Sequence, residues 1–90
     1  AQWGRVYNDA AAIVSALNIY NALHESDVIT SIGHANISDA LADVANLPDE
    51  ALEDLDSQKI IEHKENGMWV VNPRTDTMTL PEAYGGEADE

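Results

Sequence analysis

The sequence predicts an α+β fold in which three helices precede a C-terminal β-hairpin. Three observations lead to this prediction. Apolar residues recur at helical spacing over residues 9–24, two shorter segments then begin with residues typical of helix starts, and Asn66-Gly67 separates two short apolar strands. Ninety residues make one domain. We expect this domain to span residues 1–81, with residues 82–90 forming an acidic, flexible tail.

The first helix is predicted from about Asp9 to His24. Asn8 is placed to cap it by accepting a hydrogen bond from a backbone N–H, and Asp9 suits the positive end of the helix dipole. The apolar positions are Ala10, Ile13, Val14, Leu17 and Tyr20, widened by Ala16, Ile19 and Leu23. A stripe this broad predicts burial on more than one side, in the centre of the core. A homodimer formed through this helix is the alternative.

A second helix is predicted in the segment NISDALADVANL, residues 36–47. Asn36 and Asp39 have the spacing of a capping box. The apolar face of this helix comprises Ile37, Ala40, Leu41 and Val44. Before it, Val28, Ile29 and Ile32 are too few to decide between a short strand and one helical turn.

A third, short helix is predicted in NLPDEALEDLDSQ, residues 46–58. Pro48 suits the first helical position, where the N–H that it lacks would have no partner. The inward positions are Ala51, Leu52 and Leu55. The remaining surface carries acids at Asp49, Glu50, Glu53, Asp54 and Asp56. This helix is therefore expected to present carboxylates to solvent.

The hairpin is predicted around Asn66-Gly67, a pair that readily adopts the positive φ values of a two-residue type I′ turn. Counting outward from the turn pairs Glu65 with Met68, Lys64 with Trp69, His63 with Val70 and Glu62 with Val71. Alternation then gives one face with Ile61, His63, Met68 and Val70, and a second face with Ile60, Glu62, Lys64, Trp69 and Val71. The register predicts a cation–π contact between Lys64 and Trp69. The segment TMTL, residues 77–80, is a candidate for a short return strand.

The predicted core combines the inward faces of these elements. Its members are Ile13, Val14, Leu17, Tyr20, Leu41, Val44, Leu52, Leu55, Ile61 and Val70.

Charge is the outlying property of the composition. Seventeen acidic residues against four basic ones give a formal net charge of −13, which repels phosphate and anionic lipid and attracts basic protein surfaces. Adaptation to high salt, selection for a basic partner and simple solubility each account for such a charge. The chain has no cysteine, no apolar run long enough to span a membrane and no recognisable signal peptide. We therefore expect no membrane association and a cytoplasmic location.

Motifs that indicate catalysis are missing from the sequence. There is no cysteine nucleophile, no G-x-S-x-G, no phosphate-binding glycine loop and no H-E-x-x-H. His24, His34 and His63 lie on different predicted elements at no metal-ligand spacing. Acid pairs such as Glu50 and Asp54, four residues apart on one helix, are expected to be solvated. We therefore expect a non-enzymatic protein with no catalytic residue, no metal site and no cofactor.

The stretch ISDALADVANLPDEALEDLDSQKIIEHKENGMWVV, residues 37–71, resembles the winged-helix branch of the helix-turn-helix superfamily. It has the order of a second helix, a turn, a short third helix and two wing strands around Asn66-Gly67. The resemblance implies a winged-helix-like fold. It also implies a third helix of the kind that enters the major groove of DNA.

The charge of the third helix argues against DNA as the partner. The helix presents five acids and no Lys or Arg before Lys59, whereas DNA affinity normally comes from neutralising several phosphates. We therefore expect a protein partner with a basic surface. The residues expected to bind it are Asp49, Glu50, Glu53, Asp54, Asp56, Lys64 and Trp69. Such a module would act as a regulator, or as a virus-encoded inhibitor that imitates nucleic acid.

Two other functions stay open on the sequence alone. One is a DNA-binding winged-helix transcriptional regulator adapted to high salt, because screening weakens the repulsion between its acids and phosphate. The other is a structural subunit whose broad first helix packs against copies of itself.

Overall fold

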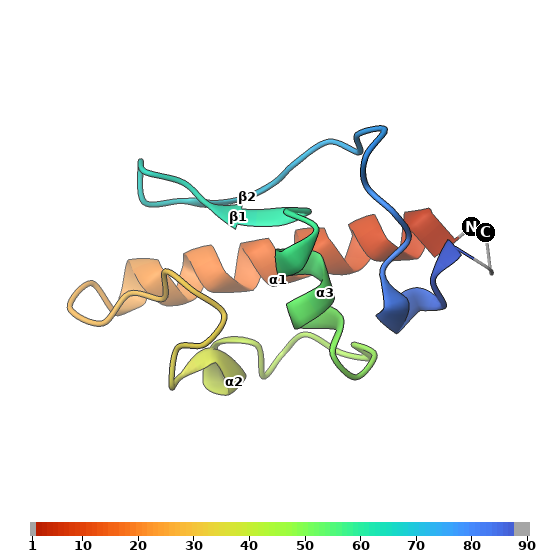
Figure 1. The fold of residues 1–90 in the computed structure, drawn as a ribbon. Helices are drawn as coiled ribbons and strands as arrows, with labels where there is room; N and C mark the ends of the chain where they lie inside the picture. The colour runs from red at the N-terminus through yellow and green to blue at the C-terminus, as the bar shows by residue number, and fades with distance from the viewer. Residues whose placement is uncertain (1, 88–90) are drawn as a thin grey trace.

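One long helix, α1 (Gln2–Leu23), forms the axis on which the other elements pack (Figure 1). The structure is a computed structural model that describes residues 2–87. After α1 come α2 (Ile37–Ala40), α3 (Ala51–Ser57), β1 (Ile61–His63), β2 (Trp69–Val71) and the 3-10 helix η1 (Glu82–Tyr84). Three helices and a two-stranded antiparallel hairpin make an α+β fold, which confirms the predicted class.

Helix α1 begins seven residues earlier than predicted, so Asn8 lies inside the helix and does not cap it. The reason is visible in the pattern of burial. The buried side chains of α1 are Trp3, Val6, Ala10, Ile13 and Leu17. Their spacing of three or four residues continues one apolar stripe back to the first turn. Packing along a single face therefore stabilises the helix from Trp3 to Leu17.

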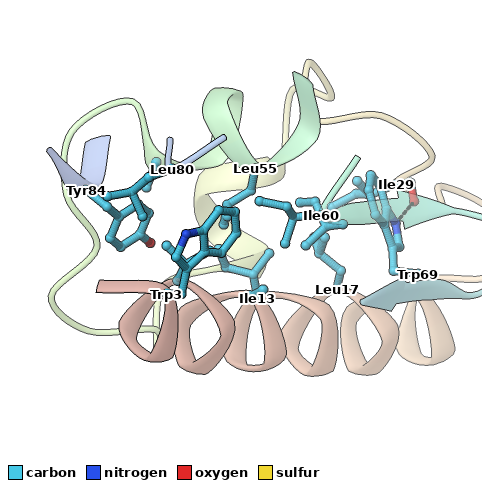
Figure 2. Packing of buried hydrophobic residues seen from close by; sticks show 13 residues of the cluster. Trp3, Ile13, Leu17, Ile29, Leu55, Ile60, Trp69, Leu80 and Tyr84 are labelled. Carbon is cyan, nitrogen blue, oxygen red and sulfur yellow. Dashed lines mark hydrogen bonds between the residues drawn. The ribbon is translucent and has the colours of Figure 1, made fainter. Parts of the chain in front are cut away.

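The hydrophobic core is a row of side chains along α1 (Figure 2). Trp3 and Tyr84 lie at one end of the row, and Trp69 and Ile29 lie at the other. The buried members are Trp3, Val6, Ala10, Ile13, Leu17, Ile29, Ala51, Leu55, Ile60, Ile61, Trp69, Leu80 and Tyr84. Residues from α1, the loop after it, α3, the hairpin and the C-terminal segment thus contribute buried side chains to one cluster, whereas α2 contributes only partly buried ones.

The predicted core is correct in its main members. Ile13, Leu17, Leu55 and Ile61 are fully buried. Partly buried residues that pack against the cluster include Val14, Tyr20, Leu41, Val44 and Leu52. Val70 is the error, since it lies outside the cluster and its neighbour Trp69 is buried instead.

This error follows from the hairpin, which is one residue out of the predicted register. The observed pairs are Ile61 with Val71, Glu62 with Val70 and His63 with Trp69. A shift of one residue moves side chains to the opposite face of a strand. Trp69 therefore shares the inner face with Ile61, and its ring meets the ring of His63 edge-on with centroids 5.5 Å apart.

The turn of the hairpin explains the shift. The Lys64 N–H donates to the Met68 carbonyl at 2.8 Å, and the Gly67 N–H donates to the Lys64 carbonyl at 2.9 Å. Residues 65–67 thus form a three-residue loop in place of the expected two-residue turn. Gly67 has a φ of 91°, which is the left-handed conformation that closes such a loop.

The two short helices also differ from prediction. Helix α2 is a single turn, and the side chain of Asn36 makes no capping hydrogen bond. It donates instead to the Asp27 carboxylate at 2.9 Å and to the Tyr20 hydroxyl at 3.1 Å. Helix α3 begins at Ala51 rather than at Pro48, because Glu50 has a left-handed φ of 65° and so precedes the helix. Segment 28–32 contains no strand or helix, and TMTL forms no strand.

The C-terminal segment packs on the core up to residue 87, where a flexible tail was expected. Tyr84 is only 1% exposed, and its hydroxyl donates to Asp9 Oδ2 at 2.6 Å. The Ala83 N–H donates to Asp54 Oδ2, also at 2.6 Å. These contacts join η1 to α1 and to α3, so this part of the expected tail belongs to the fold. Residues 88–90 of that tail lie outside the described residues.

Candidate functional site

Four carboxylates on and just before α3 face solvent. Asp49, Glu50, Glu53 and Asp56 are all exposed. We call these four residues the α3 acidic surface. Asp54 was expected to join them, but it is only partly exposed, and its carboxylate is occupied by the Ala83 N–H. The sequence therefore predicted this surface correctly except for Asp54, which fastens η1 to α3.

Helix α3 is held firmly beneath this surface. Ala51 and Leu55 are buried on its inner side. At its C-terminal end the Ile60 N–H donates to the Leu55 carbonyl at 2.9 Å, and Lys59 adopts a left-handed φ of 59°. This arrangement ends the helix and turns the chain into β1. The exposed acids thus project from a fixed scaffold, which favours recognition because little order must be gained on binding.

An apolar hollow of about 630 Å³ adjoins the α3 acidic surface. We call it the α3 hollow. Its apolar lining is Ile32, Ile37, Leu41, Leu47 and Leu52, and its acidic lining is Asp49, Glu50 and Glu53. All five of these apolar side chains are partly exposed. The sequence did not reveal the hollow, because its lining comes from the loop before α2, from α2, from the segment between α2 and α3, and from α3.

Of the two contact residues expected from the hairpin, Trp69 is buried and only Lys64 is exposed. Trp69 is 2% exposed, and its indole Nε1–H donates to the Ile29 carbonyl at 2.8 Å. Its role is therefore to join β2 to the 28–32 loop within the core. Lys64 is exposed and forms an ion pair with Glu62 at 3.1 Å. Lys64 and Trp69 are not brought together as the predicted register required.

Most of the positive charge is engaged within the fold. The Arg5 guanidinium lies 5.3 Å from the centre of the Tyr84 ring, and that of Arg74 lies 4.1 Å from the Trp3 ring. Lys64 is paired with Glu62, whose pKa is lowered first by a hydrogen bond from Asn72 and then by Lys64. Three of the four bases thus have partners on the chain itself. Binding a polyanion would compete with these contacts.

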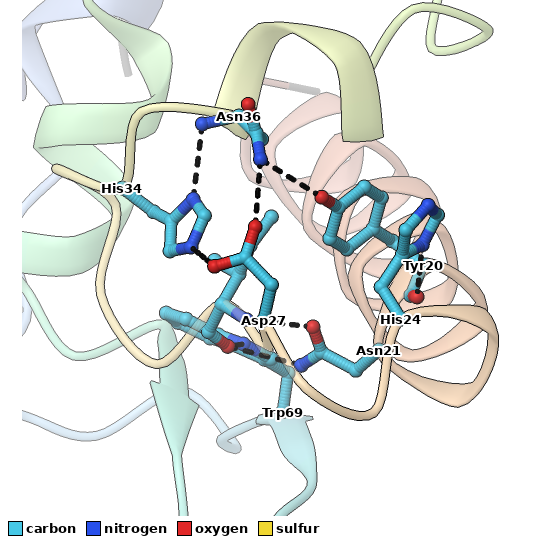
Figure 3. A network of polar contacts seen from close by, with 8 residues as sticks. Tyr20, Asn21, His24, Asp27, His34, Asn36 and Trp69 are labelled. Carbon is cyan, nitrogen blue, oxygen red and sulfur yellow. Dashed lines mark hydrogen bonds and ion pairs between the residues drawn. The ribbon is translucent and has the colours of Figure 1, made fainter.

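A polar cluster fixes the loop between α1 and α2 (Figure 3). His34 accepts a hydrogen bond at Nδ1 from the Asn36 N–H at 2.9 Å, and its Nε2 donates to Asp27 Oδ1 at 3.1 Å. Both ring nitrogens are therefore occupied, and neither is left for a substrate or a metal. Within residues 2–87, no group of three or more histidines, aspartates or glutamates is arranged to hold a metal ion.

The described helices include none that is long and apolar enough to cross a membrane. No family model, curated protein or solved structure matches the chain. The winged-helix resemblance of residues 37–71 therefore stays a prediction that rests on the order of the elements.

Proposed function

We propose that this chain is a non-enzymatic interaction module that binds a basic protein surface through the α3 acidic surface. The observation that carries the proposal is the juxtaposition of exposed carboxylates and an apolar hollow on one rigid face. Three of the four carboxylates, those of Asp49, Glu50 and Glu53, line the α3 hollow itself. The site thus offers both charge and apolar contact.

Electrostatics supports a basic partner. A net charge of −13 creates a negative field around the whole molecule, and opposite charges accelerate encounter and suppress unsuitable partners. Charged groups at an interface chiefly set the rate of encounter and the choice of partner, and apolar anchors in a pocket supply much of the affinity. A Lys or Arg side chain over the acids and an apolar side chain in the hollow would use both features.

The same charge distribution disfavours nucleic acid at this face. The carboxylates would lie within about 10 Å of any phosphates docked there, which is about one Debye length at 0.1 M salt. The bases available to offset them include Arg5, Arg74 and Lys64, and these already interact with other side chains of the chain. Such a module is suited to occupy the nucleic-acid-binding surface of a partner protein. We therefore propose that it acts as a regulator or an inhibitor.

The test compares two variants of equal charge. In the first, Asp49→Asn, Glu50→Gln and Glu53→Gln remove three carboxylates from the α3 hollow. In the control, Glu25→Gln, Glu65→Gln and Asp76→Asn remove three exposed carboxylates elsewhere. Each variant and the original chain are used to capture proteins from the native host, and captured proteins are identified by mass spectrometry. The affinity of the purified partner is then measured by calorimetry at several salt concentrations.

We expect the first variant to lose a basic partner that the original chain and the control both retain. Affinity for that partner should fall as salt rises, because the interaction depends on opposite charges. Equal capture by the two variants would show that the α3 acidic surface is not the binding site. Retention of duplex DNA by the original chain in a gel-shift assay at 0.15 M salt would contradict the proposal itself.

A further inference from the structure

A second groove runs beside α1 and shares no lining residue with the α3 hollow. Its volume is about 520 Å³, and it is lined by α1 and by residues 39–45, at the end of α2 and just after it. We call it the α1 groove. Its apolar lining includes Ala12, Ala16, Ile19, Leu23, Ala40 and Val44. Ile19 and Leu23 are 60% and 75% exposed, which is unusual for large apolar side chains on a helix that also forms the core.

Four apolar residues of the groove, exposed or partly exposed, form one line along α1. Ala12, Ala16, Ile19 and Leu23 are separated by four, three and four residues, so they occupy a single face of the helix. Between residues 12 and 23 this line is about 16 Å long, at 1.5 Å per residue. Alanines at one end allow close approach of another element, while Ile19 and Leu23 at the other end supply apolar surface.

Acids border the α1 groove. Asp9, Asp39 and Asp43 line it, and no Lys or Arg does. Asp39 and Asp43 are exposed, whereas Asp9 accepts the hydrogen bond from Tyr84. The negative charge at the rim therefore favours an occupant with basic side chains.

One wall of the groove is already ordered. The His24 ring stacks on Tyr20 with centroids 3.9 Å apart, and His24 Nδ1 donates to the Tyr20 carbonyl at 2.9 Å. The Tyr20 hydroxyl in turn accepts a hydrogen bond from the Asn36 side chain (Figure 3). These contacts fix the shape of this wall of the groove without any partner.

We propose that the α1 groove binds an amphipathic helix of a partner protein, with about three turns of apolar face flanked by basic residues. A helix satisfies its own backbone hydrogen bonds, whereas an extended segment would leave N–H and C=O groups unpaired against this apolar line. Basic flanks would meet Asp39 and Asp43. This inference rests on the proposed function, since both require a basic protein partner.

A second copy of the chain fits this groove poorly. A two-fold dimer through α1 would place the acidic rims of both copies at one interface, and each copy carries a net charge of −13. Like charges placed opposite one another oppose association. The charge of the chain therefore favours a foreign basic helix over self-association, which was the sequence-based alternative for this helix.

The test uses a synthetic helical peptide of about 15 residues made of Leu, Ala and Lys, long enough to cover the apolar line. Its leucines lie on one face and its lysines flank them. The control peptide has the same composition in an order that gives no apolar face. Both are titrated into the full chain, with binding followed by calorimetry and by the backbone amide signals in NMR spectra.

We expect the amphipathic peptide to bind about tenfold or more tightly than its isomer, because only it can place apolar side chains in the groove. Amide signals of residues 12–23 and 39–45 should shift. The variant Ile19→Gln with Leu23→Gln should lose this preference. A matched variant, Val28→Gln with Met68→Gln, removes two exposed apolar side chains outside the groove and should keep it.

Several outcomes would overturn the inference. Equal binding of both peptides would show attraction by charge alone. Shifts confined to residues 47–53 would place the peptide in the α3 hollow, which would leave the proposed function intact. A concentration-dependent dimer that Ile19→Gln dissociates, measured by analytical ultracentrifugation, would make a second copy the occupant. Loss of peptide binding in the Asp49, Glu50 and Glu53 variant, with the groove variant unaffected, would also reject it.

Discussion

The side chain of Asn18 on α1 pairs with the backbone of Trp69 on β2 through two hydrogen bonds. Asn18 Oδ1 accepts from the Trp69 N–H at 2.9 Å, and Asn18 Nδ2 donates to the Trp69 carbonyl at 3.0 Å. Asn18 thus occupies the position that a third strand would take beside β2, and it satisfies backbone groups that the hairpin leaves unpaired.

A second asparagine, three residues later on α1, makes the same pair of hydrogen bonds to another backbone segment. Asn21 Oδ1 accepts from the Ile29 N–H at 2.7 Å, and Asn21 Nδ2 donates to the Ile29 carbonyl at 2.9 Å. The Ile29 carbonyl also accepts from the Trp69 indole. Two asparagines on one helix therefore fix both the hairpin and the loop that carries the buried Ile29.

Replacement of Asn18 by alanine should lower the free energy of unfolding by about 2–3 kcal/mol, because two partly buried backbone groups lose their partners. The measurement is urea denaturation followed by circular dichroism. Asn8→Ala is the matched control, since Asn8 is exposed on the same helix. It should be neutral or stabilising by up to about 0.5 kcal/mol from helix propensity. If Asn18→Ala is as stable as Asn8→Ala, the pairing with Trp69 contributes nothing.

The C-terminal segment provides a second prediction, through Tyr84. Burial, followed by the hydrogen bond to the Asp9 carboxylate, raises the pKa of the Tyr84 hydroxyl above its usual value. A raised pKa in the folded state means that this group stabilises the fold below about pH 10, the usual tyrosine pKa. The contribution is lost as pH rises further, because the folded state resists the ionisation that the unfolded state allows.

Tyr84→Phe should therefore lower the free energy of unfolding by about 1–2 kcal/mol at pH 7, since it removes one hydrogen bond to a carboxylate and keeps the packing. Between pH 9.5 and 11, the original chain should lose more stability than the variant, and the two curves should converge. Tyr7, whose pKa is also raised by burial, is present in both proteins, so the difference between them isolates Tyr84. Parallel curves would mean that Tyr84 ionises equally in both states.

The loop of the hairpin gives a third prediction. Gly67→Ala should destabilise the protein by about 1 kcal/mol, because alanine is strained at the φ of 91° found there. Steric overlap adds nothing, since no heavy atom lies within 4 Å of the added Cβ. Gly33→Ala is the control, because Gly33 has no positive φ and its added Cβ meets only Ser31 Oγ at 3.9 Å. Equal thermal unfolding midpoints for the two variants would contradict the three-residue loop.

Sequence patterns were sufficient wherever the determining contacts are local. The α+β class, the order of the elements and the exposure of Asp49, Glu50, Glu53 and Asp56 all followed from periodicity and charge. The earlier start of α1 was also readable, because Trp3 and Val6 continue the apolar stripe of Ala10 and Ile13. The capping preference of Asn8 and the favourable position of Asp9 near the helix dipole argued for a later start, and packing outweighed both.

Contacts between distant residues could not be predicted in this way. The register of the hairpin is stabilised by Asn18, which is 51 residues from Trp69, and turn propensity alone favoured the neighbouring register. Burial of Tyr84 likewise depends on Asp9, 75 residues away. The α3 hollow and the α1 groove each combine residues from several segments, so they exist only in the folded chain.

Salt provides the last prediction, because the net charge of −13 must weaken the folded state through repulsion among carboxylates. Raising sodium chloride from 0.05 to 0.5 M shortens the screening length and should increase the free energy of unfolding by roughly 1–2 kcal/mol. For a domain of this size each kcal/mol raises the unfolding midpoint by about 4–8 °C. Differential scanning calorimetry measures this increase.

The control for this effect is the Asp49→Asn, Glu50→Gln, Glu53→Gln variant, which carries three fewer negative charges. If repulsion is the cause, the variant should start from a higher midpoint at low salt and gain less as salt is added. Any contribution of chloride or sodium to apolar burial would act equally on both proteins, so the difference between them reports electrostatics alone. Identical salt responses would show that Asp49, Glu50 and Glu53 do not destabilise the fold through repulsion.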